Sequence, residues 1–176
     1  MAARDILPFT SADGGHRRML SARMDATADY DHGDVVAVAA AGDLVEASTE
    51  HDPGATLGGV AMMASQSVAN ARVGDKLLAT AASRGETVSY IPFDFNEEFI
   101  TENITADDDA VLDEVPLESQ IGDLCNLRTG SGLWGISVHA SGSALNFAVT
   151  QVLDANFKPV GVTGAAGVYA VFARVS

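Results

Sequence analysis

Short runs in which apolar residues alternate with small or polar ones recur along this chain, separated by Gly, Ser and Asp. The clearest of these runs fill the last third of the chain, at residues 121–127, 133–139, 145–153 and 167–175. Strands with one buried face alternate in this way, and the Gly and Ser clusters between them are typical of tight turns. The pattern therefore predicts a mainly β protein, built as a single compact β-barrel or β-sandwich.

Similar runs upstream predict further strands at residues 33–40, 42–49, 57–63 and 86–95. A Gly-Asp pair precedes several of the runs. Gly supplies the backbone freedom of a tight turn, and Asp accepts hydrogen bonds from nearby amides. The first two upstream strands are close enough to form a hairpin through Ala41. Pro92 has no N–H to donate, so its strand lies at a sheet edge or ends near this residue.

The first 32 residues differ from the rest of the chain in charge. They are nearly neutral and hold four of the ten basic residues, whereas the net charge of −14 falls almost wholly on residues 33–176. An apolar hook and an Arg cluster would allow an arm to dock on another acidic subunit. We therefore predict an N-terminal arm at 1–32 and a β-domain at 33–176, with a disordered chain end as the alternative. The candidate partner-binding residues of the arm are Ile6, Leu7, Phe9, Arg17, Arg18 and Arg23.

Residues 94–118 form an acidic segment with ten Asp or Glu residues and no Lys or Arg. Its scattered apolar side chains are enough to hold it on the domain, so we predict a long surface excursion that leads into the final strands. Within it, Asp107–Asp109 suggest a calcium loop, but Leu112 occupies the sixth position, where such a loop needs Gly. A solvated charge run is therefore expected, with an irregular cation site as the alternative.

The excess of acids limits the classes of partner. Nucleic-acid binding needs clustered Lys and Arg to neutralise phosphates, and here 10 basic residues face 24 acidic ones. The same balance disfavours anionic membrane surfaces, and no apolar run approaches the ~18 residues of a spanning helix. The first residues lack the apolar core of a signal peptide, so we expect synthesis in the cytoplasm. We predict neither a nucleic-acid nor a membrane partner.

Residues 130–135 match the letters G-x-G-x-x-G of a dinucleotide loop, but a strand pattern follows where that loop needs a helix. We interpret them as the Gly-rich turn of a hairpin. The segment 135–139, which contains Ser137 and His139, lacks the second Gly of the G-x-S-x-G elbow found in serine hydrolases. No set of Cys and His residues has the spacing of zinc ligands. Cys125, the single cysteine, lies in an apolar run and is expected in the core. We predict no catalytic residue, cofactor or metal, and hence no enzyme.

Trp134 is the only tryptophan and stands within this Gly-rich stretch. A tryptophan in such a position either fills the core or anchors a contact with a partner. We therefore keep it among the candidate partner-binding residues.

Four segments of the chain carry a resemblance to a known family. They are Val88-Ser-Tyr-Ile-Pro-Phe-Asp-Phe, Ile121-Gly-Asp-Leu-Cys-Asn-Leu, Gly135-Ile-Ser and Phe147-Ala-Val-Thr-Gln-Val-Leu-Asp154. In this order they resemble small structural proteins of tailed bacteriophages that are encoded near the major capsid protein. These look like head decoration, or cement, proteins, which sit as β-barrels on the outer surface of the capsid. The resemblance covers about half of the chain.

The resemblance implies that the chain binds the major capsid protein on the outside of the head. There it would stabilise the shell through its β-domain and N-terminal arm. It also implies a virion protein without a cofactor that forms a homo-oligomer, with a trimer as one candidate state.

Two other functions remain open. Another virion component, such as a tail tube or head–tail connector protein, would be found in rings or tubes. A soluble ligand-binding β-barrel would need an aromatic-lined pocket, for which an aromatic content of 6% provides little material.

Overall fold

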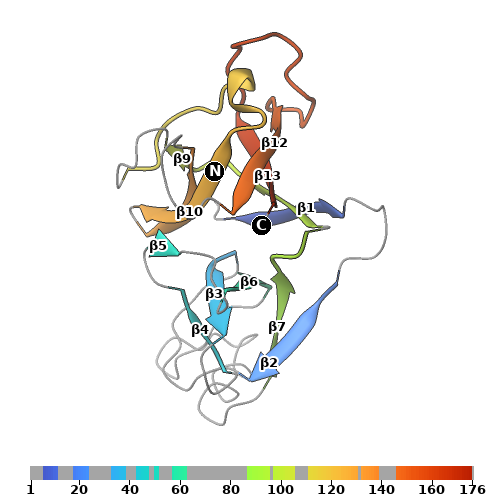
Figure 1. Ribbon diagram of the computed structural model, residues 1–176, viewed down its shortest axis with the longest axis vertical. Coiled ribbons are helices and arrows are strands. Elements are labelled where there is room, and N and C mark those ends of the chain that lie inside the picture. The colour runs from blue at the N-terminus through green and yellow to red at the C-terminus, as the bar shows by residue number, and fades with distance from the viewer. Residues whose placement is uncertain are drawn as a thin grey trace. The chain divides into compact units, whose positions relative to one another are not determined.

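The computed structural model contains two compact units (Figure 1). The residues that it describes are 6–11, 18–23, 33–38, 43–47, 50–51, 57–62, 87–95, 97–105, 111–130, 132–138 and 146–175. Unit 1 comprises Met1–Arg17, Thr49–Pro53 and Asp94–Ser176, and unit 2 comprises Arg18–Ser48 and Gly54–Phe93. Each unit therefore combines segments that are distant in sequence.

Unit 1 holds one eight-stranded sheet in the order β1-β8-β13-β12-β10-β11-β9, with β5 beside β10 off this path. Its strands are β1 (Leu7–Ser11), β5 (Glu50–His51), β8 (Glu97–Thr101), β9 (Ile104–Thr105), β10 (Leu124–Gly130), β11 (Leu133–Ser137), β12 (Phe147–Leu153) and β13 (Tyr169–Arg174). Neighbours run antiparallel except β9 and β11, which are parallel. Because β13 pairs with both β8 and β12, it lies inside the sheet.

Three phenylalanines on neighbouring strands lie in the core of unit 1. Phe172 of β13 is the register partner of Phe99 of β8, and their ring centroids are 6.0 Å apart. The ring of Phe147 on β12 meets that of Phe172 edge-on, with 5.6 Å between the centroids. All three side chains are fully buried. Aromatic pairs at such distances add about 0.5–1.5 kcal/mol each beyond their buried area, so this cluster ties three strands together.

A tight turn leads into β10, which then shares its edges among three strands. Gly122 in this turn has a φ of 93°, in the left-handed region that favours glycine. The first residues of β10 pair with β12, whereas its middle pairs with β5. The opposite edge forms a hairpin with β11, in which Gly130 faces Leu133. β10 therefore joins β5 and β11 to the central strands.

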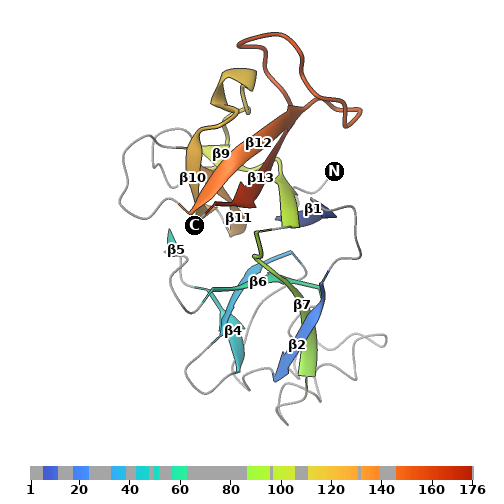
Figure 2. The same ribbon diagram turned by 45° about the vertical axis from the view of Figure 1, so that its right-hand side comes forward.

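Unit 2 is a five-stranded antiparallel sheet in the order β2-β7-β6-β3-β4, curled as a half-barrel (Figure 2). Its strands are β2 (Leu20–Arg23), β3 (Val35–Val38), β4 (Leu44–Glu46), β6 (Leu57–Ala61) and β7 (Thr87–Pro92). A buried cluster of Val36, Leu44, Ala61 and Tyr90 connects β3, β4, β6 and β7.

The mainly β class predicted from the sequence is confirmed. The runs of the last third form β10, β11, β12 and β13, and the upstream runs form β3, β4, β6 and β7. The predicted antiparallel pairing of β3 with β4 is present. Pro92 ends β7, which lies inside its sheet, so the strand-end alternative is the correct one.

Among the described residues there is no α-helix, and the one helical turn is the 3-10 turn η2 (Glu118–Gln120). No helix in that part of the chain is long and apolar enough to cross a membrane.

The acidic segment differs from its prediction as a surface excursion. Residues 97–105 enter the sheet of unit 1 as β8 and β9, and Glu97 is only 3% exposed. Phe99, Ile100 and Thr101 of β8 are buried as well, so both faces of this strand are largely covered. The many acidic residues of this segment therefore masked the sequence pattern of a buried strand.

The first 32 residues contribute two strands to the sheets of this chain. β1 pairs with β8 in unit 1, where Leu7 faces Ile100. β2 pairs with β7 in unit 2, where Leu20 faces Tyr90. Each partner follows much later in the sequence, so no local pattern reveals the pairing. Most other residues of the predicted arm lie outside the described part.

We predict that Gly135→Ala lowers the free energy of unfolding by about 1–3 kcal/mol, because a Cβ on β11 would overlap the backbone oxygen of Asn103. That oxygen also accepts a hydrogen bond from Ile136 N at 3.1 Å, and Asn103 Nδ2 donates to Trp134 O at 2.8 Å. The backbone of Asn103 therefore has little freedom to withdraw. Urea denaturation measures the change. Gly161→Ala is the control, because a Cβ there meets open space, and it should change stability by less than about 0.5 kcal/mol. Equal losses from the two substitutions would contradict the clash.

Candidate functional site

The apolar hook predicted to bind a partner packs on this chain. Ile6 is fully buried, and Leu7 and Phe9 are half-buried. Leu7 and Phe9 lie against a cluster that includes Ile100 of β8 and Val171 of β13. These side chains therefore cover the core of unit 1, which leaves Ile6 no exposed surface for a partner.

The other candidate partner-binding residues are scattered. Arg17 lies outside the described residues, and Arg18 is exposed just before β2. Arg23 ends β2, in register with Thr87. Trp134 is 2% exposed, so the core alternative is the correct one for this residue.

The motifs that resemble reactive sites have structural roles where they are described. Residues 130–135 lie in the β10–β11 hairpin, and Gly132 in its turn has a φ of 79°, so the predicted Gly-rich hairpin is confirmed. His139 and Asp107–Asp109 lie outside the described residues. Within the described ranges, no group of three or more His, Cys, Asp or Glu is placed to hold a metal ion.

Cys125 is fully buried in β10, as predicted for a core residue. Burial raises the pKa of its thiol far above the ordinary value, and the nearby charge of Asp123 raises it further. Because the thiolate is the reactive form, this cysteine is chemically inert in the folded protein.

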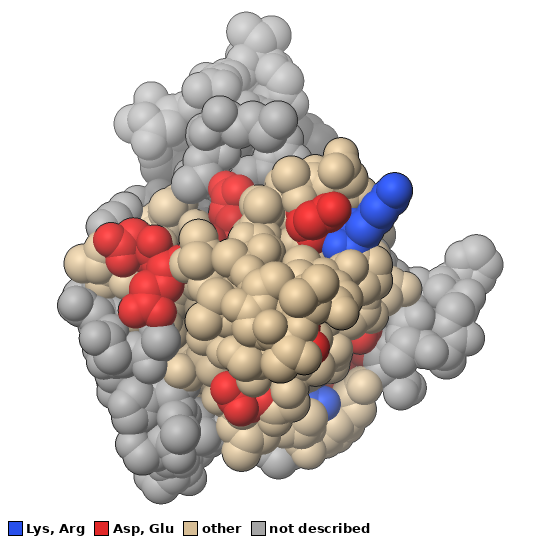
Figure 3. Space-filling model, turned by 90° about the horizontal axis from the view of Figure 1, so that it is seen from above, with Lys and Arg blue, Asp and Glu red and all other residues tan. Residues whose placement is uncertain are grey.

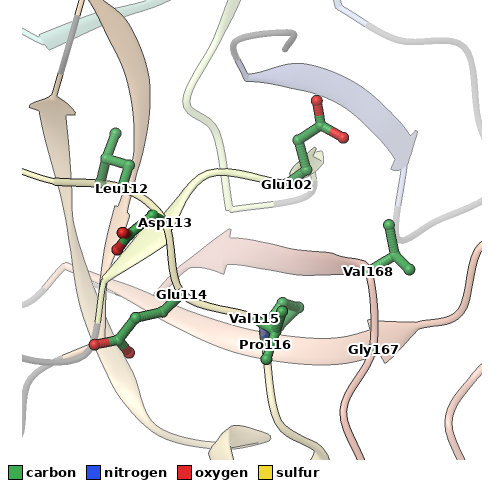
Figure 4. A pocket seen from close by; sticks show the side chains of 8 residues that line it. All are labelled: Glu102, Leu112, Asp113, Glu114, Val115, Pro116, Gly167 and Val168. Atoms are coloured by element: carbon green, nitrogen blue, oxygen red, sulfur yellow. The ribbon is translucent and has the colours of Figure 1, made fainter. Parts of the chain in front are cut away.

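A hollow of about 280 Å³ lies beside the segment that precedes η2. Its lining residues are Glu102, Leu112, Asp113, Glu114, Val115, Pro116, Gly167 and Val168 (Figure 4). Figure 4 shows the carboxylates of Glu102 and Glu114 pointing away from each other. Three carboxylates line the hollow, those of Glu102, Asp113 and Glu114.

Residues 154–168 form the loop between β12 and β13 (Figure 1). Its exposed apolar side chains are Phe157, Val162 and Val168. Val162 is 69% exposed, the highest value for a large apolar side chain among the described residues. The loop is fastened at both ends, and loops that a rigid scaffold positions are frequent binding elements. We therefore take this loop as the candidate functional site.

A tight turn at Asp154 opens the loop. The Oδ1 atom of Asp154 accepts hydrogen bonds from the backbone N of Asn156 at 2.7 Å and of Lys158 at 3.0 Å. The N–H of Lys158, followed by that of Asn156, lowers the pKa of this exposed carboxyl below its ordinary value of 3.8. Between these donors, Phe157 adopts a φ of 60°, a left-handed conformation that is rare for a bulky residue.

The strained turn places an aromatic ring at the surface. Phe157 stacks on Tyr169, with ring centroids 4.8 Å apart and an interplanar angle of 8°. Tyr169 in turn packs against the buried cluster of Ile100, Leu153 and Val171. Phe157 remains 56% exposed. Strained backbone positions of this kind concentrate at functional sites, because the surrounding structure must hold them in place.

The far end of the loop is fastened to η2 and the residues before it. Glu118 N donates to Ala165 O at 2.9 Å, and Gly164 N donates to Glu118 Oε2 at 3.1 Å. Gly167 N donates to Pro116 O at 2.8 Å. These bonds hold the apolar loop in one conformation.

The sequence carries a signal for this loop that its Gly-rich turns obscured. Residues 159–168 contain no charged residue, although most of them are exposed. On a chain with a net charge of −14, an exposed stretch without charge marks a surface that is suited to contact.

Comparisons of the chain with protein-family models, with curated protein sequences and with solved structures found no match. The candidate site therefore rests on the geometry of this chain alone.

We predict that Cys125 does not react with the thiol reagent DTNB in the folded protein, because its sulfur is buried and its raised pKa leaves almost no thiolate. After unfolding in guanidinium chloride, one thiol per chain should react. Absorbance of the released thionitrobenzoate measures both states. Rapid labelling in native buffer would show that the thiol is accessible.

We predict that Asp154→Ala loosens the stack of Phe157 on Tyr169, because two backbone N–H groups lose their acceptor. The folded-state pKa of Asp154 lies below 3.8, so its contribution is complete above that pH and is lost as the pH falls through the lower, folded-state value. Ring-current shifts of the Tyr169 protons in NMR spectra measure the stack. They should persist from pH 7 to about pH 4 in the wild type.

Two variants serve as controls for this prediction. Asp154→Asn retains an acceptor oxygen and should keep the stack without the acid transition. Asp123→Ala removes another exposed carboxylate and should leave the stack unchanged. Identical spectra for Asp154→Ala and the wild type would show that the turn does not depend on Asp154.

Proposed function

We propose that this chain is a bacteriophage capsid decoration protein, which binds the outer surface of the head and stabilises the shell. The observation that carries the proposal is the position of the four segments that resemble this family. They coincide with β7, β10, β11 and β12, which are central parts of the two sheets. The resemblance thus rests on the strands that form the folded units.

The charge and the architecture support this proposal. A net charge of −14 favours the solubility of a protein that is made in many copies. Copies that bind a repeating surface, especially as a homo-oligomer such as a trimer, gain affinity because their contacts act together. Each contact with the major capsid protein can then be weak.

The first 32 residues are part of the folded units as well as a predicted arm. Because β1 and β2 belong to the sheets of this chain, deleting residues 1–32 removes one strand from each unit. A loss of shell binding after that deletion would therefore report on folding as much as on contact. The test requires the full-length protein.

We predict that the full-length protein cosediments with heads purified from the virus that encodes it, when those heads are assembled without it. Cryo-electron microscopy should then show it at symmetry-related positions on the outer surface, and the heads should resist a higher temperature. Heads that already carry the protein are the control and should bind no more of it. Absence from the outer surface, with location in the tail or connector instead, would favour the other virion role. Absence of binding would overturn the proposal.

A further inference from the structure

One end of unit 1 carries a surface of few charges around residues 159–168 of the β12–β13 loop. Its exposed apolar side chains are Phe157, Val162 and Val168 of the loop and Ile121 beside it, and we call this surface the loop face. Figure 3 views unit 1 from this end and shows uncharged residues across the middle, with several Asp and Glu and fewer Lys or Arg side chains around them. An apolar centre within a polar rim is the usual anatomy of a protein–protein contact.

The loop face is organised before any partner arrives. The Asp154 turn holds one end of the loop, and the bonds to Pro116 and Glu118 hold the other. Phe157 already rests on Tyr169 in a strained conformation. Binding by a flexible loop loses affinity to the ordering of side chains and backbone, and a fixed loop avoids most of that loss.

Charge decides which kind of partner fits the loop face. Three acids lie around the loop face: Glu118 and Asp154, which hold the two ends of the loop, and Asp123, which follows η2. Within residues 111–127 and 146–173, Lys158 is the one basic residue. A second copy docked face to face would bring an acidic rim against an acidic rim, which is unfavourable. A surface with an apolar centre and Lys or Arg at its margin fits both features.

We propose that the loop face is the docking surface through which this chain binds the outer surface of the shell, at a site with an apolar centre and a basic margin. This inference rests on the proposed function and names the part of the molecule that performs it. Phe157 and Val162 are the central contacts, and the acids around them select the partner.

The test compares substitutions on the loop face with matched substitutions elsewhere in unit 1, using purified heads that lack the protein as the probe. Val162→Asp should weaken binding at least about tenfold, because it places a charge in the apolar centre. Val175→Asp makes the same change at the opposite end of β13 and should alter binding by less than about twofold.

A second pair removes an aromatic ring without adding charge. Phe157→Ala should also weaken binding at least about tenfold, whereas Phe95→Ala removes an equally exposed ring, 58% against 56%, and should not. Phe95 lies under the guanidinium of Arg174, at the end of β13 away from the loop. Wild-type binding should also weaken as salt rises, because the rim and the basic margin attract each other.

The outcomes separate this inference from the proposed function. Wild-type binding that Val162→Asp and Phe157→Ala leave unchanged would overturn the docking surface and leave the decoration function standing. Failure of the wild type and of both controls to bind heads would overturn the function and this inference with it. Analytical sedimentation of the free protein tests the loop face in a second way. If the wild type self-associates and Val162→Asp abolishes that association, the loop face binds a second copy of the chain, and its assignment to the shell is overturned.

Discussion

The packing of Phe172 between Phe99 and Phe147 is the constraint on which unit 1 depends. β8 is distant in sequence from the consecutive strands β12 and β13, so bringing the three rings together closes a long loop at a cost in chain entropy. Their burial offsets that cost in one register only, since a slip of one residue would turn a ring to the other face of its sheet. The adjacency of β8, β13 and β12 follows from this register.

The same register positions the loop face. Leu153 lies opposite Tyr169 across β12 and β13, so the chain leaves the sheet at Asp154 beside the ring on which Phe157 stacks. A turn of only a few residues then returns the chain, and Pro159 bridges back to Leu153. The left-handed conformation of Phe157 is tolerated because the hydrogen bonds to Asp154 and the aromatic stack compensate for it. A core constraint thus determines the geometry of a surface site.

Local patterns in the sequence were sufficient for the strands that alternate cleanly, such as β12 and β13, and for the glycine turns beside them. They were insufficient where pairing is long-range, as for β1 with β8, because the partner's position is not encoded nearby. The acidic composition of residues 94–118 predicts a surface excursion because acids are rarely buried, yet Glu97 lies buried in β8. The strained turn was beyond prediction for a related reason: the residue at the left-handed position is Phe157, where Gly or Asn is expected.

In the proposed binding to the shell, the negative charge of the chain and its apolar loop face have different roles. Charges at a rim act through solvent and are screened by salt, so they guide encounter and reject wrong partners more than they hold the complex. Apolar side chains that are already fixed in position stabilise the complex, because they lose little conformational entropy when they bind a matching surface. In solution, the net charge of −14 opposes non-specific association between copies. On the repeating shell of the proposed function, many modest contacts would act together, and repulsion between copies would not prevent stable attachment.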